Sequence, residues 1–383
     1  MHLGGLDMGL TNIKLGDYIE RSTINNKDLK YGGDLIVGVN SQGVFATPKG
    51  NTDGVDLKPY KIVENGAFVY NPTRLELGSI AYRTEGLCIV SHLYMVFYLT
   101  DEGKKIIDPM WLYIYFRRSE FCREVKFRNF GSQRPEFNFN DMSDIVIPLP
   151  DIELQKKYVD IYNAMLENQK SYERGLDDLK LVCDAYIENL SNCKQEKIGK
   201  YVERNKKKNQ DVNFSKCDVK GFNNEGQFIE PMRLFSGDIS TFKIISKDDL
   251  VYNSRINSTI KRLSIVINEG KNLIVSPAYE SFKVVKEKEL CPFYLYMLLQ
   301  RESFARKVLF NSFGSSTIVF GFDDLCEIEI PVPSFSEQES IANMYRLYKE
   351  RWNINEKLKA QIKDICPILI KGSIEEATKA KEA

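Results

Sequence analysis

Basic side chains at the ends of apolar runs are the residues of this sequence whose types and spacing point to binding chemistry. Arg74 and Arg255 each follow a Tyr-Asn pair where a run with strand character ends. A loop at such a place can carry a planar guanidinium to guanine or to phosphate, and a surface ion pair is the alternative role. Lys206, Lys207 and Lys208 lie in an expected loop and suit phosphate contacts, which position a protein on nucleic acid without reading its sequence.

Weaker candidates of the same kind lie near other expected loops. Gln133 and Arg134 could reach base edges or could simply hold the turn before Pro135. Three further cations are candidates for similar contacts: Arg83, Lys261 and Arg262. The aromatic residues near these loops are expected in the core rather than at a binding surface.

The charge of the sequence is balanced overall but uneven locally. Its 53 Lys and Arg equal its 53 Asp and Glu, so any face that binds a polyanion must be local. From Lys194 to Lys220 there are nine basic residues against four acidic ones, and from Arg117 to Arg134 there are six against two. Each run could also be a solvated face of the protein.

The sequence lacks the motifs that most enzymes and metal sites use. It has only two histidines, His2 and His92, and neither a phosphate-binding loop, a dinucleotide-binding GxGxxG after a strand, nor a nucleophile elbow. Its eight cysteines form no CxxC pair, which disfavours both zinc and a disulfide framework. The acid pairs Asp177-Asp178 and Asp323-Asp324 are explained as helix-surface or cap residues. We therefore expect a noncatalytic chain without a metal or cofactor of its own.

The length and composition indicate two globular domains. A chain of 383 residues exceeds one ordinary core, and its hydrophobic (43%) and charged (28%) fractions are those of a globular protein. No stretch approaches the roughly 20 apolar residues of a membrane span, so no membrane partner is expected. The first seven residues lack the basic and apolar regions of a secretory signal, which favours a cytoplasmic location.

The two halves of the sequence align at a separation of 183 residues, with a slight slip in the middle. Matching positions include Lys14–Arg21 with Lys197–Arg204, Val69–Asn71 with Val251–Asn253, Phe121 with Phe304, Phe127 with Phe310, Phe130–Ser132 with Phe313–Ser315, and Gln155 with Gln338. So many identities in one register indicate a tandem duplication.

Each copy is expected to be an α+β globule followed by a long helix. The expected strands are Leu35–Val39, Ala67–Tyr70, Cys88–Leu99, Leu250–Tyr252, Leu263–Ile267, Leu273–Val275 and Phe282–Val285, and the expected helices are Met110–Phe127 and Pro292–Leu309. Short strands separated by Gly and Asn favour a small curled sheet over a doubly wound one.

A long amphipathic helix is predicted after each globule. The first follows Ile147–Pro150 with Asp151 as its N-cap, and the second follows Ile330–Pro333 with a capping box of Ser336 and Glu339. The two apolar stripes are expected to pair as an antiparallel coiled coil. The residues predicted to pack are Tyr158, Ile161, Met165, Tyr172, Leu179, Ile341, Tyr348, Trp352, Leu358 and Ile362.

These elements predict four parts in the chain. They are a first recognition globule at 1–150, a spacer helix at 151–193, a second recognition globule at 194–333, and a second spacer helix with a tail at 334–383. The fold class is α+β, a tandem duplication in which the two spacer helices pair. About 36 helical residues span roughly 54 Å, so the spacer is expected to set the distance between two readers of one DNA.

Three features carry a specific resemblance to a known family. Each half has an aromatic-Gly-Ser segment, then an Ile-Pro-x-Pro run, then a long helix that bears a glutamine: 130–135, 145–150 and Gln155 in the first, 313–316, 328–333 and Gln338 in the second. The segments Val69–Arg74 and Val251–Arg255 resemble recognition-domain loops of that family. The chain resembles the DNA-specificity (S) subunit of type I restriction-modification systems. It departs from the family at Thr317-Ile318, where Gln-Pro is usual.

The resemblance implies a noncatalytic reader of double-stranded DNA. Each recognition domain would read one half of a bipartite, gapped site, mostly in the major groove. Two DNA methyltransferase (M) subunits would dock on the chain, restriction (R) subunits would join in the full complex, and S-adenosylmethionine and ATP would bind those partners. The alternatives are an S-like scaffold or decoy paralogue that binds proteins without reading DNA, and an S-like subunit of a fused enzyme.

Overall fold

The protein divides into two compact units, each built around one copy of the repeat. The structure is a computed structural model and describes residues 10–48, 50, 52, 54–129, 136–211, 213–231, 237–256, 262–311 and 318–382. The first unit joins Met1–Glu173 to Ile354–Ala383, and the second is Arg174–Asn353. The long helices α5 (Ile152–Glu188) and α9 (Phe335–Glu382) each contribute a segment to both units. The predicted spacer helices are therefore shared between the units rather than separate from them.

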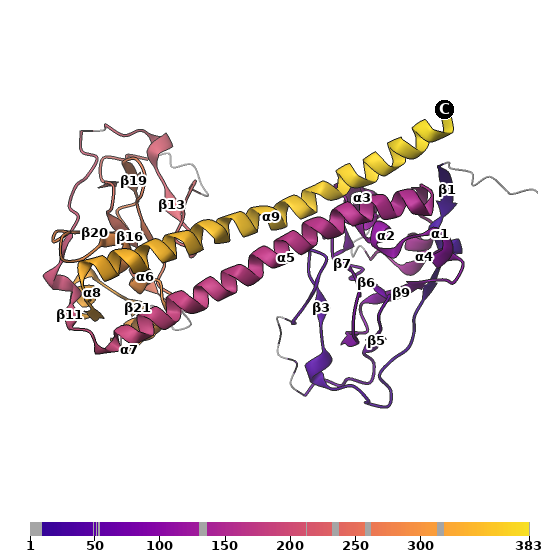
Figure 1. The fold of residues 1–383 in the computed structure, drawn as a ribbon, viewed down its shortest axis with the longest axis horizontal. Coiled ribbons are helices and arrows are strands. Elements are labelled where there is room, and N and C mark those ends of the chain that lie inside the picture. The colour runs from indigo at the N-terminus through magenta and orange to yellow at the C-terminus, as the bar shows by residue number, and fades with distance from the viewer. Residues whose placement is uncertain are drawn as a thin grey trace, which may run out of the picture. The chain divides into compact units, whose positions relative to one another are not determined.

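The first unit carries a small antiparallel sheet flanked by two-stranded ladders (Figure 1). The sheet has the order β2 (Ile19–Arg21), β9 (Met95–Leu99), β6 (Phe68–Tyr70), β7 (Ile80–Tyr82). The ladders are β1 (Thr11–Lys14) with β10 (Val146–Leu149), β3 (Gly38–Val39) with β4 (Phe45–Ala46), and β5 (Lys61–Val63) with β8 (Cys88–Val90). The helices are α1 (Gly103–Ile106), α2 (Pro109–Phe116), α3 (Ser119–Arg128) and α4 (Phe139–Ser143), with 3-10 turns η1 (Leu15–Asp17), η2 (Gly33–Leu35) and η3 (Leu75–Leu77).

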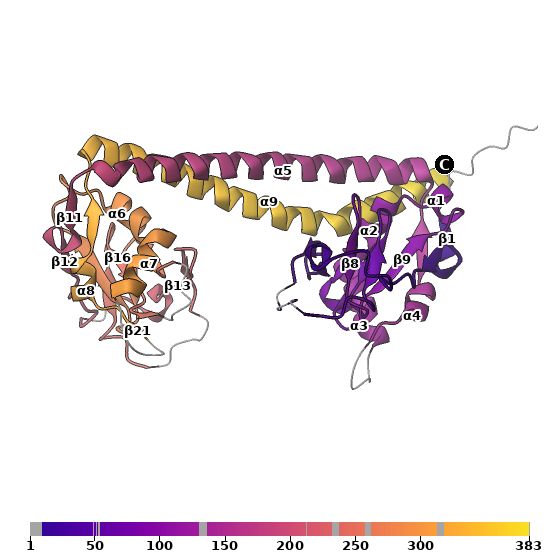
Figure 2. The ribbon, with the colours of Figure 1, turned by 90° about the horizontal axis from the view of Figure 1, so that it is seen from below.

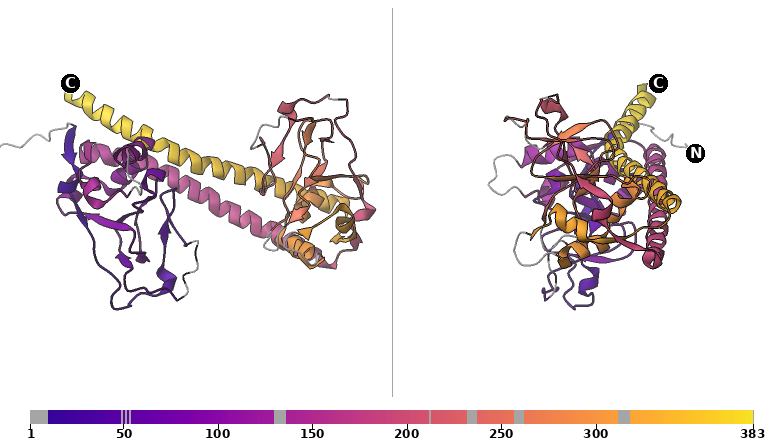
Figure 3. Two further views of the ribbon diagram at one scale, coloured as in Figure 1. Left: turned by 180° about the vertical axis from the view of Figure 1, so that it is seen from behind. Right: turned by 90° about the vertical axis from the view of Figure 1, so that its left-hand side faces the viewer.

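The second unit repeats this plan and adds one ladder. Figure 3 shows its strands and helices from two further sides. Its sheet has the order β12 (Val202–Arg204), β20 (Glu280–Val284), β16 (Leu250–Tyr252), β18 (Ile265–Ile267). The ladders are β11 (Gln195–Lys197) with β22 (Glu329–Pro331), β13 (Gly221–Phe222) with β14 (Phe228–Ile229), β15 (Lys243–Ile245) with β19 (Leu273–Val275), and β17 (Arg255–Ile256) with β21 (Ile318–Val319). The helices are α6 (Pro292–Leu299), α7 (Glu302–Asn311) and α8 (Phe322–Glu327), with 3-10 turns η4 (Asn189–Asn192), η5 (Ile198–Lys200) and η6 (Lys216–Asp218).

The central strand of each sheet is buried on both faces. In β6, Phe68 and Tyr70 point into the main core with Trp111 of α2, whereas Val69 points into a smaller cluster with Val63. Strand β16 of the second unit is covered on both faces in the same way. Because successive side chains of a strand alternate between faces, double coverage explains why these strands are uninterrupted apolar runs.

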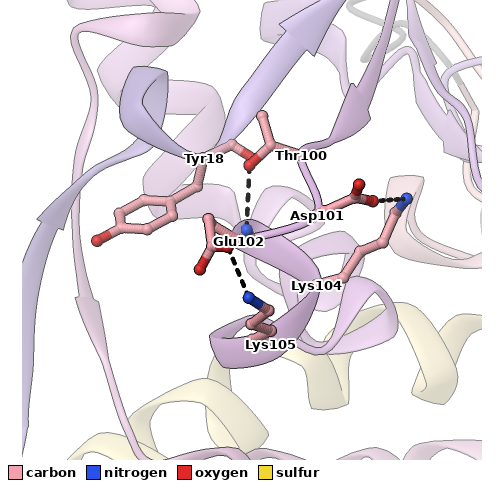
Figure 4. Close-up of polar contacts among 7 residues, drawn as sticks. Tyr18, Thr100, Asp101, Glu102, Lys104 and Lys105 are labelled. Carbon is pink, nitrogen blue, oxygen red and sulfur yellow. Dashed lines mark hydrogen bonds and ion pairs between the residues drawn. The ribbon is translucent and has the colours of Figure 1, made fainter.

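A compact polar turn joins β9 to α1 (Figure 4). The Thr100 N–H donates to the Tyr18 carbonyl oxygen (2.9 Å), and Thr100 Oγ1 accepts from the Gly103 N–H (3.0 Å). A Cβ at position 103 would lie 2.5 Å from the Tyr18 carbonyl oxygen, so the turn requires glycine. Two exposed ion pairs lie beside it: Lys104–Asp101 (3.0 Å) and Lys105–Glu102 (2.6 Å). The turn leads the chain to α2, which packs beneath the sheet.

Each helix predicted before the Phe-Gly-Ser segment is two helices, so that part of the prediction is wrong. Between α2 and α3 the buried Arg117 donates from Nη1 to the Gly78 carbonyl oxygen at 2.5 Å, and Arg118 is extended (φ −69°, ψ 146°). Between α6 and α7 the buried Gln300 donates to the Ile265 carbonyl oxygen at 2.8 Å. In both units the helix is interrupted at the residue whose buried polar side chain donates a hydrogen bond to a carbonyl oxygen of a strand or turn. Arg117, the first residue of the basic run Arg117–Arg134, is therefore not part of the surface.

The predicted duplication extends to individual hydrogen bonds. Gln155 accepts from the Asp108 N–H (2.8 Å) and donates to the carbonyl oxygens of Ile106 (2.8 Å) and Pro150 (2.7 Å). Gln338 makes the same three bonds, each partner 183 residues further on: the Cys291 N–H (2.9 Å) and the carbonyl oxygens of Glu289 (2.9 Å) and Pro333 (3.0 Å). Each glutamine ties the first turn of a long helix to the loop that precedes α2 or α6.

We expect Gln338→Leu to lower the free energy of unfolding by about 3 kcal/mol, because the fully buried amide satisfies three backbone groups that would lose their partner. Urea unfolding would measure the change. Gln210→Leu, at an exposed turn position, is the matched control and should change stability by less than about 0.5 kcal/mol. Equal losses in the two variants would contradict the role of the amide.

The predicted antiparallel pairing of α5 and α9 is present within the first unit. Lys157 pairs with Glu376 (2.7 Å), Gln169 Nε2 donates to Asn355 Oδ1 (3.0 Å), and Glu173 pairs with Lys359 (2.6 Å), so rising numbers on one helix meet falling numbers on the other. Gln169 and Asn355 are both buried, and such a polar pair in a helical seam fixes register. In the second unit the α5 and α9 segments line one groove together.

The helix positions predicted to pack differ in their burial. Ile341 is fully buried and Ile362 nearly so, and Tyr158 and Met165 pack partly buried against the first core. The remaining positions are half-buried: Tyr172, Leu179, Tyr348, Trp352 and Leu358. Ile161 was wrongly predicted. Its side chain is 44% exposed, because Val159 and Tyr162 occupy the buried face of this turn.

The N-termini of the long helices were predicted with mixed success. Asp151 caps α5 as predicted, since its Oδ1 accepts from the Glu153 (3.1 Å) and Leu154 (3.0 Å) N–H groups. The capping box of α9 is formed by Ser334 and Glu337, not by Ser336 and Glu339. Helix α9 begins at Phe335, directly after Ser334, so the capping pair lies two residues earlier than the sequence pattern suggested.

Candidate nucleic-acid interface

Arg74 of the first unit lies in a rigid loop with its side chain in solvent. The Asn71 side chain accepts from the Thr73 N–H (3.1 Å), and the Arg74 carbonyl oxygen accepts from the N–H groups of Leu77 (3.0 Å) and Ser79 (3.2 Å). Arg74 is exposed, and among the described residues its guanidinium has no ion-pair partner. The backbone of this loop is held by hydrogen bonds, and the guanidinium is exposed. Such a side chain can bind a ligand with little loss of backbone entropy.

Helix α3 and the turn η3 pack together, so the Arg74 loop and α3 form one surface. We call this surface, Asn71–Gly78 with Ser119–Arg128, the first loop edge. The Phe137 N–H donates to the Pro72 carbonyl oxygen (3.0 Å), which brings the chain after the Phe-Gly-Ser segment to the same place. Figure 2 shows α3 in the lower part of the first unit, farther from α5 than α2 is.

The second unit has a corresponding surface at the β17–β21 ladder, which we call the second loop edge. The Arg255 N–H donates to Asn253 Oδ1 (3.0 Å), and the Phe320 N–H donates to the Ser254 carbonyl oxygen (2.8 Å). Arg255 is exposed on β17. In Figure 2, β21 lies on the side of the second unit away from α5.

Arg74 and Arg255 occupy neighbouring rather than equivalent positions of the repeat. Because Phe137 bonds Pro72 and Phe320 bonds Ser254 in the same way, Arg255 corresponds to Thr73, which also donates its N–H to the preceding asparagine side chain. The two guanidiniums therefore leave different points of their loops. The resulting contacts are expected to differ between the two halves of a target.

The other predicted contacts are only partly described. Gln133, Arg134 and Lys261 lie outside the described residues. Arg83 is half-buried, with its guanidinium over the Phe45 ring at 5.3 Å from the centroid and its Nε buried without a hydrogen-bond partner in the described part of the chain. Packing against an aromatic ring makes Arg83 a structural side chain at the β7–β8 turn rather than an exposed contact.

Lys206 and Lys207 line an open hollow of about 1130 Å³ between η5, β12, β20 and α8. Lys247 and Lys283 also line it, and among the described residues none of these four lysines forms an ion pair. Lys208 is exposed beside the hollow and forms a backbone bridge with Lys243. The first copy has Thr23, Ile24 and Asn25 at the positions of the lysine triplet, so the repeat does not carry the triplet in the first unit.

The buried carboxylate of Asp249 forms hydrogen bonds with two other residues that line this hollow. Asp249 is 6% exposed and accepts from the Ser246 N–H (2.8 Å) and from Asn205 Nδ2 (3.1 Å). Burial raises the pKa of the Asp249 carboxyl group, while the backbone hydrogen bond from Ser246 and the charges of Lys207 and Lys283 oppose that rise. The free lysines around it make the hollow suited to a phosphate group.

Arg262 lies at a different place from Arg255 and the lysines. It lines a second groove of about 1000 Å³, with Tyr345, Tyr348 and Lys349 of α9. Lys349 donates to the Glu225 carbonyl oxygen (3.1 Å), and burial lowers the pKa of Lys349 to about 8. The two hollows share no lining residue, so the predicted cations of the second unit do not form a single cluster.

The sequence prediction missed two exposed aromatic residues on the helices beside the loops. Phe127 on α3 is 81% exposed and Phe310 on α7 is 76% exposed, although aromatic residues there were expected in the core. The missed signal is helical spacing. Phe121 and Val125 form the buried stripe of α3, and position 127 lies off that stripe.

Two features are absent from the described part of the chain. It contains no group of three or more His, Cys, Asp and Glu side chains placed to hold a metal ion. None of its helices is both long enough and apolar enough to cross a membrane.

Comparison with known proteins assigns the family. The family of type I restriction modification DNA specificity domains matches residues 10–177 and 187–364. The S subunit of the type I restriction-modification system of M. genitalium shares the fold, with 12% identity, 97% of this chain and 98% of that chain covered, and a TM-score of 0.57. The HsdS subunit from Thermoanaerobacter tengcongensis is 15% identical with 96% of each chain covered and a TM-score of 0.39. No curated protein matches the chain. Since both copies of the repeat match, the chain belongs to the type I restriction modification DNA specificity family.

Proposed function

We propose that this chain is the noncatalytic specificity subunit of a type I restriction-modification complex, and that it reads a bipartite, gapped site in double-stranded DNA. The observation that carries the proposal is the duplicated loop edge. Each DNA specificity domain presents an exposed guanidinium from a loop held by an asparagine side chain, on Arg74 in one unit and Arg255 in the other. Two related but non-identical readers on one chain suit two different half-sites.

In this proposal, different cations have different roles. A guanidinium can bind guanine O6 and N7 with two hydrogen bonds in the major groove, which discriminates one base pair from the others. The lysines around the hollow of the second unit suit phosphate contacts, which add affinity without sequence preference. We therefore expect the second unit to contribute more of the salt-dependent affinity than the first.

The catalytic steps belong to partner subunits in this proposal. Two DNA methyltransferase subunits would dock on the chain and bind S-adenosylmethionine, and restriction subunits with ATP would join in the full complex. The chain supplies the positioning of the target base relative to those subunits. The long helices α5 and α9 offer extended exposed surface for such docking.

Selection of bound sequences from random DNA tests the proposal. The assembled complex of this chain with its methyltransferase subunits should enrich one motif made of two fixed half-sites and an unread gap, as seen by mobility shift and sequencing. A well-formed complex that enriches no motif would favour a scaffold that binds proteins without reading DNA.

A further inference from the structure

One lysine and one arginine of the second unit share a carboxylate at one end of the sheet. Glu280, the first residue of β20, has its Oε2 atom 3.7 Å from Lys243 Nζ and 3.9 Å from Arg204 Nε. Lys243 also donates to the Tyr279 carbonyl oxygen, and Arg204 Nη2 lies 3.8 Å from Asp323 Oδ1 of α8. Both cations therefore have counterions within their own unit.

The first unit repeats the two cations at the corresponding positions. Lys61 Nζ donates to the Tyr94 carbonyl oxygen at 2.5 Å, and Met95 follows Tyr94. Lys243 and Glu280 have the same relation in the second unit. The strand registers also match position by position: Arg21 opposite Phe97 with Arg204 opposite Phe282, and Tyr70 opposite Met95 with Tyr252 opposite Glu280.

Neither carboxylate has a counterpart in the first unit. Met95 stands in place of Glu280, and Asn140 stands in place of Asp323. Among the described residues, the arginine and the lysine of the first unit form no ion pair. The repeat has therefore kept the two cations of the first unit without the acids that neutralise them in the second.

The ammonium group of Lys61 is buried without a counterion. Lys61 is 8% exposed, and within the described part of the chain its ammonium makes one hydrogen bond, the bond to the Tyr94 carbonyl oxygen. An ammonium group has three donors, and buried charges are ordinarily paired. Burial lowers the pKa of Lys61, and the nearby charge of Arg21 lowers it further. An anion between the two cations would oppose both effects.

The two cations lie at the end of the sheet that carries the first loop edge. Strand β6 ends at Tyr70, directly before Asn71 of that edge, and β9 begins opposite it at Met95. Strand β2 ends at Arg21 on the other side of β9. The Tyr70 hydroxyl, like that of Tyr252, is buried without a hydrogen-bond partner in the described part of the chain. This position favours DNA over a partner protein as the source of the anion, because the first loop edge is the surface assigned to DNA.

We propose that Arg21 and Lys61 form a binding site for a phosphate group of the DNA backbone in the first unit, and that Glu280 closes the equivalent site of the second unit. This inference rests on the proposed function and adds to it a backbone contact that one of the two domains makes and the other does not. The phosphate lies where the second unit has its carboxylate, so it meets both a guanidinium and an ammonium group. Such a contact positions the DNA without reading its sequence.

Met95→Glu tests the site by giving the first unit the carboxylate of the second. In the assembled methyltransferase complex, it should weaken binding to specific and nonspecific DNA alike, about 10-fold, and reduce the salt slope of the binding constant by about 1. The urea midpoint of the chain should stay the same or rise, because the new carboxylate pairs a buried ammonium group. That readout separates a lost contact from a lost fold. Met95→Gln has the length of glutamate without its charge, so this matched control should keep the wild-type salt slope.

Two further variants test the cations themselves. Arg21→Gln should cause the same uniform loss of affinity and the same change in salt slope as Met95→Glu. Glu280→Gln is the reciprocal change in the second unit, where it removes the shared counterion of Arg204 and Lys243. It should strengthen binding to all sequences about 3-fold and increase the salt slope by about 1.

The outcomes separate this inference from the proposed function. If the wild-type complex selects no motif, the proposed function fails. If the wild-type complex selects a motif and both Met95→Glu and Arg21→Gln keep its affinity and salt slope, the phosphate site fails alone. Loss of base preference at one position of a half-site would make Arg21 a reader and would overturn the phosphate contact. Weaker assembly with methyltransferase subunits in the absence of DNA, with DNA affinity retained by the complex that does form, would assign the site to a carboxylate of a partner protein and would also overturn the inference.

Discussion

A four-residue insertion after Glu173 in α5, matched by one after Asn353 in α9, is expected to lengthen the unread gap by one or two base pairs. The boundary between the two units crosses both helices at these points, so matched insertions preserve every contact within each unit. Four residues add about 6 Å of helix, and a base pair occupies about 3.4 Å of duplex. The half-site sequences should not change, because the loop edges are untouched.

The pairing of α5 and α9 supplies the control for this experiment. An insertion in α5 alone, placed within the first unit, would shift α5 relative to α9. It would break either the ion pair of Lys157 with Glu376 or the buried hydrogen bond of Gln169 with Asn355. A single insertion after Tyr162 should therefore destabilise the first unit and lower the yield of assembled complex. Altered half-site bases with an unchanged gap in the matched double insertion would contradict the role of the helices as a spacer.

Reversal of charge at the loop edges is expected to erase one half-site at a time. Arg74→Glu should weaken specific binding at least about 100-fold, because it removes a contact worth about 1–3 kcal/mol and adds repulsion from the DNA. The discrimination lost should be that of the half-site read by the first unit, and Arg255→Glu should affect the other half-site. Competition binding with DNA altered in one half-site at a time would measure both effects.

Charge reversal elsewhere on the same units controls for nonspecific repulsion. Lys58→Glu and Lys271→Glu change an exposed lysine outside the loop edges. They should weaken binding to all sequences equally and by a smaller factor. If Arg74→Glu lowered affinity for every sequence to the same extent as Lys58→Glu, Arg74 would be a phosphate contact and not a reader.

Periodicity and repetition made much of the fold predictable. The separation of 183 residues predicted two matching units, and the structure repeats it down to the three hydrogen bonds of Gln155 and Gln338. The stripes of the long helices predicted their pairing, because a helix of that length cannot leave an apolar face in water. Local turns of these helices were less predictable. Whether Ile161 or Val159 is buried depends on the rotation of α5 against the first core.

The candidate site was predictable by residue type but not by geometry. The loops that carry Arg74 and Arg255 could be located, since both follow a buried strand and an asparagine. The sequence pattern did not show which arginines and lysines are buried and which are exposed. Arg117 is buried and bonds the Gly78 carbonyl oxygen, and Arg83 packs against the Phe45 ring. Both partners come from distant segments of the chain, so the sequence pattern around each arginine does not reveal them.

The exposure of Phe127 and Phe310 could not be predicted from residue type either. An aromatic residue in a helix of a globular protein is usually buried, and only the position of Phe127 relative to Phe121 and Val125 distinguishes it. That distinction requires the exact start of α3. The sequence pattern merged α3 with α2, so the phase of the helix was lost at the break beside Arg117.

Mapping of methylated bases tests the central claim most directly. Cells that express the methyltransferase subunits with and without this chain would be compared by sequencing that reports modified bases across the genome. We predict that modification depends on the chain and falls in one motif of two fixed half-sites separated by a constant unread gap. Chain-dependent modification at a continuous motif, or modification unchanged by removal of the chain, would contradict a two-domain reader of bipartite DNA.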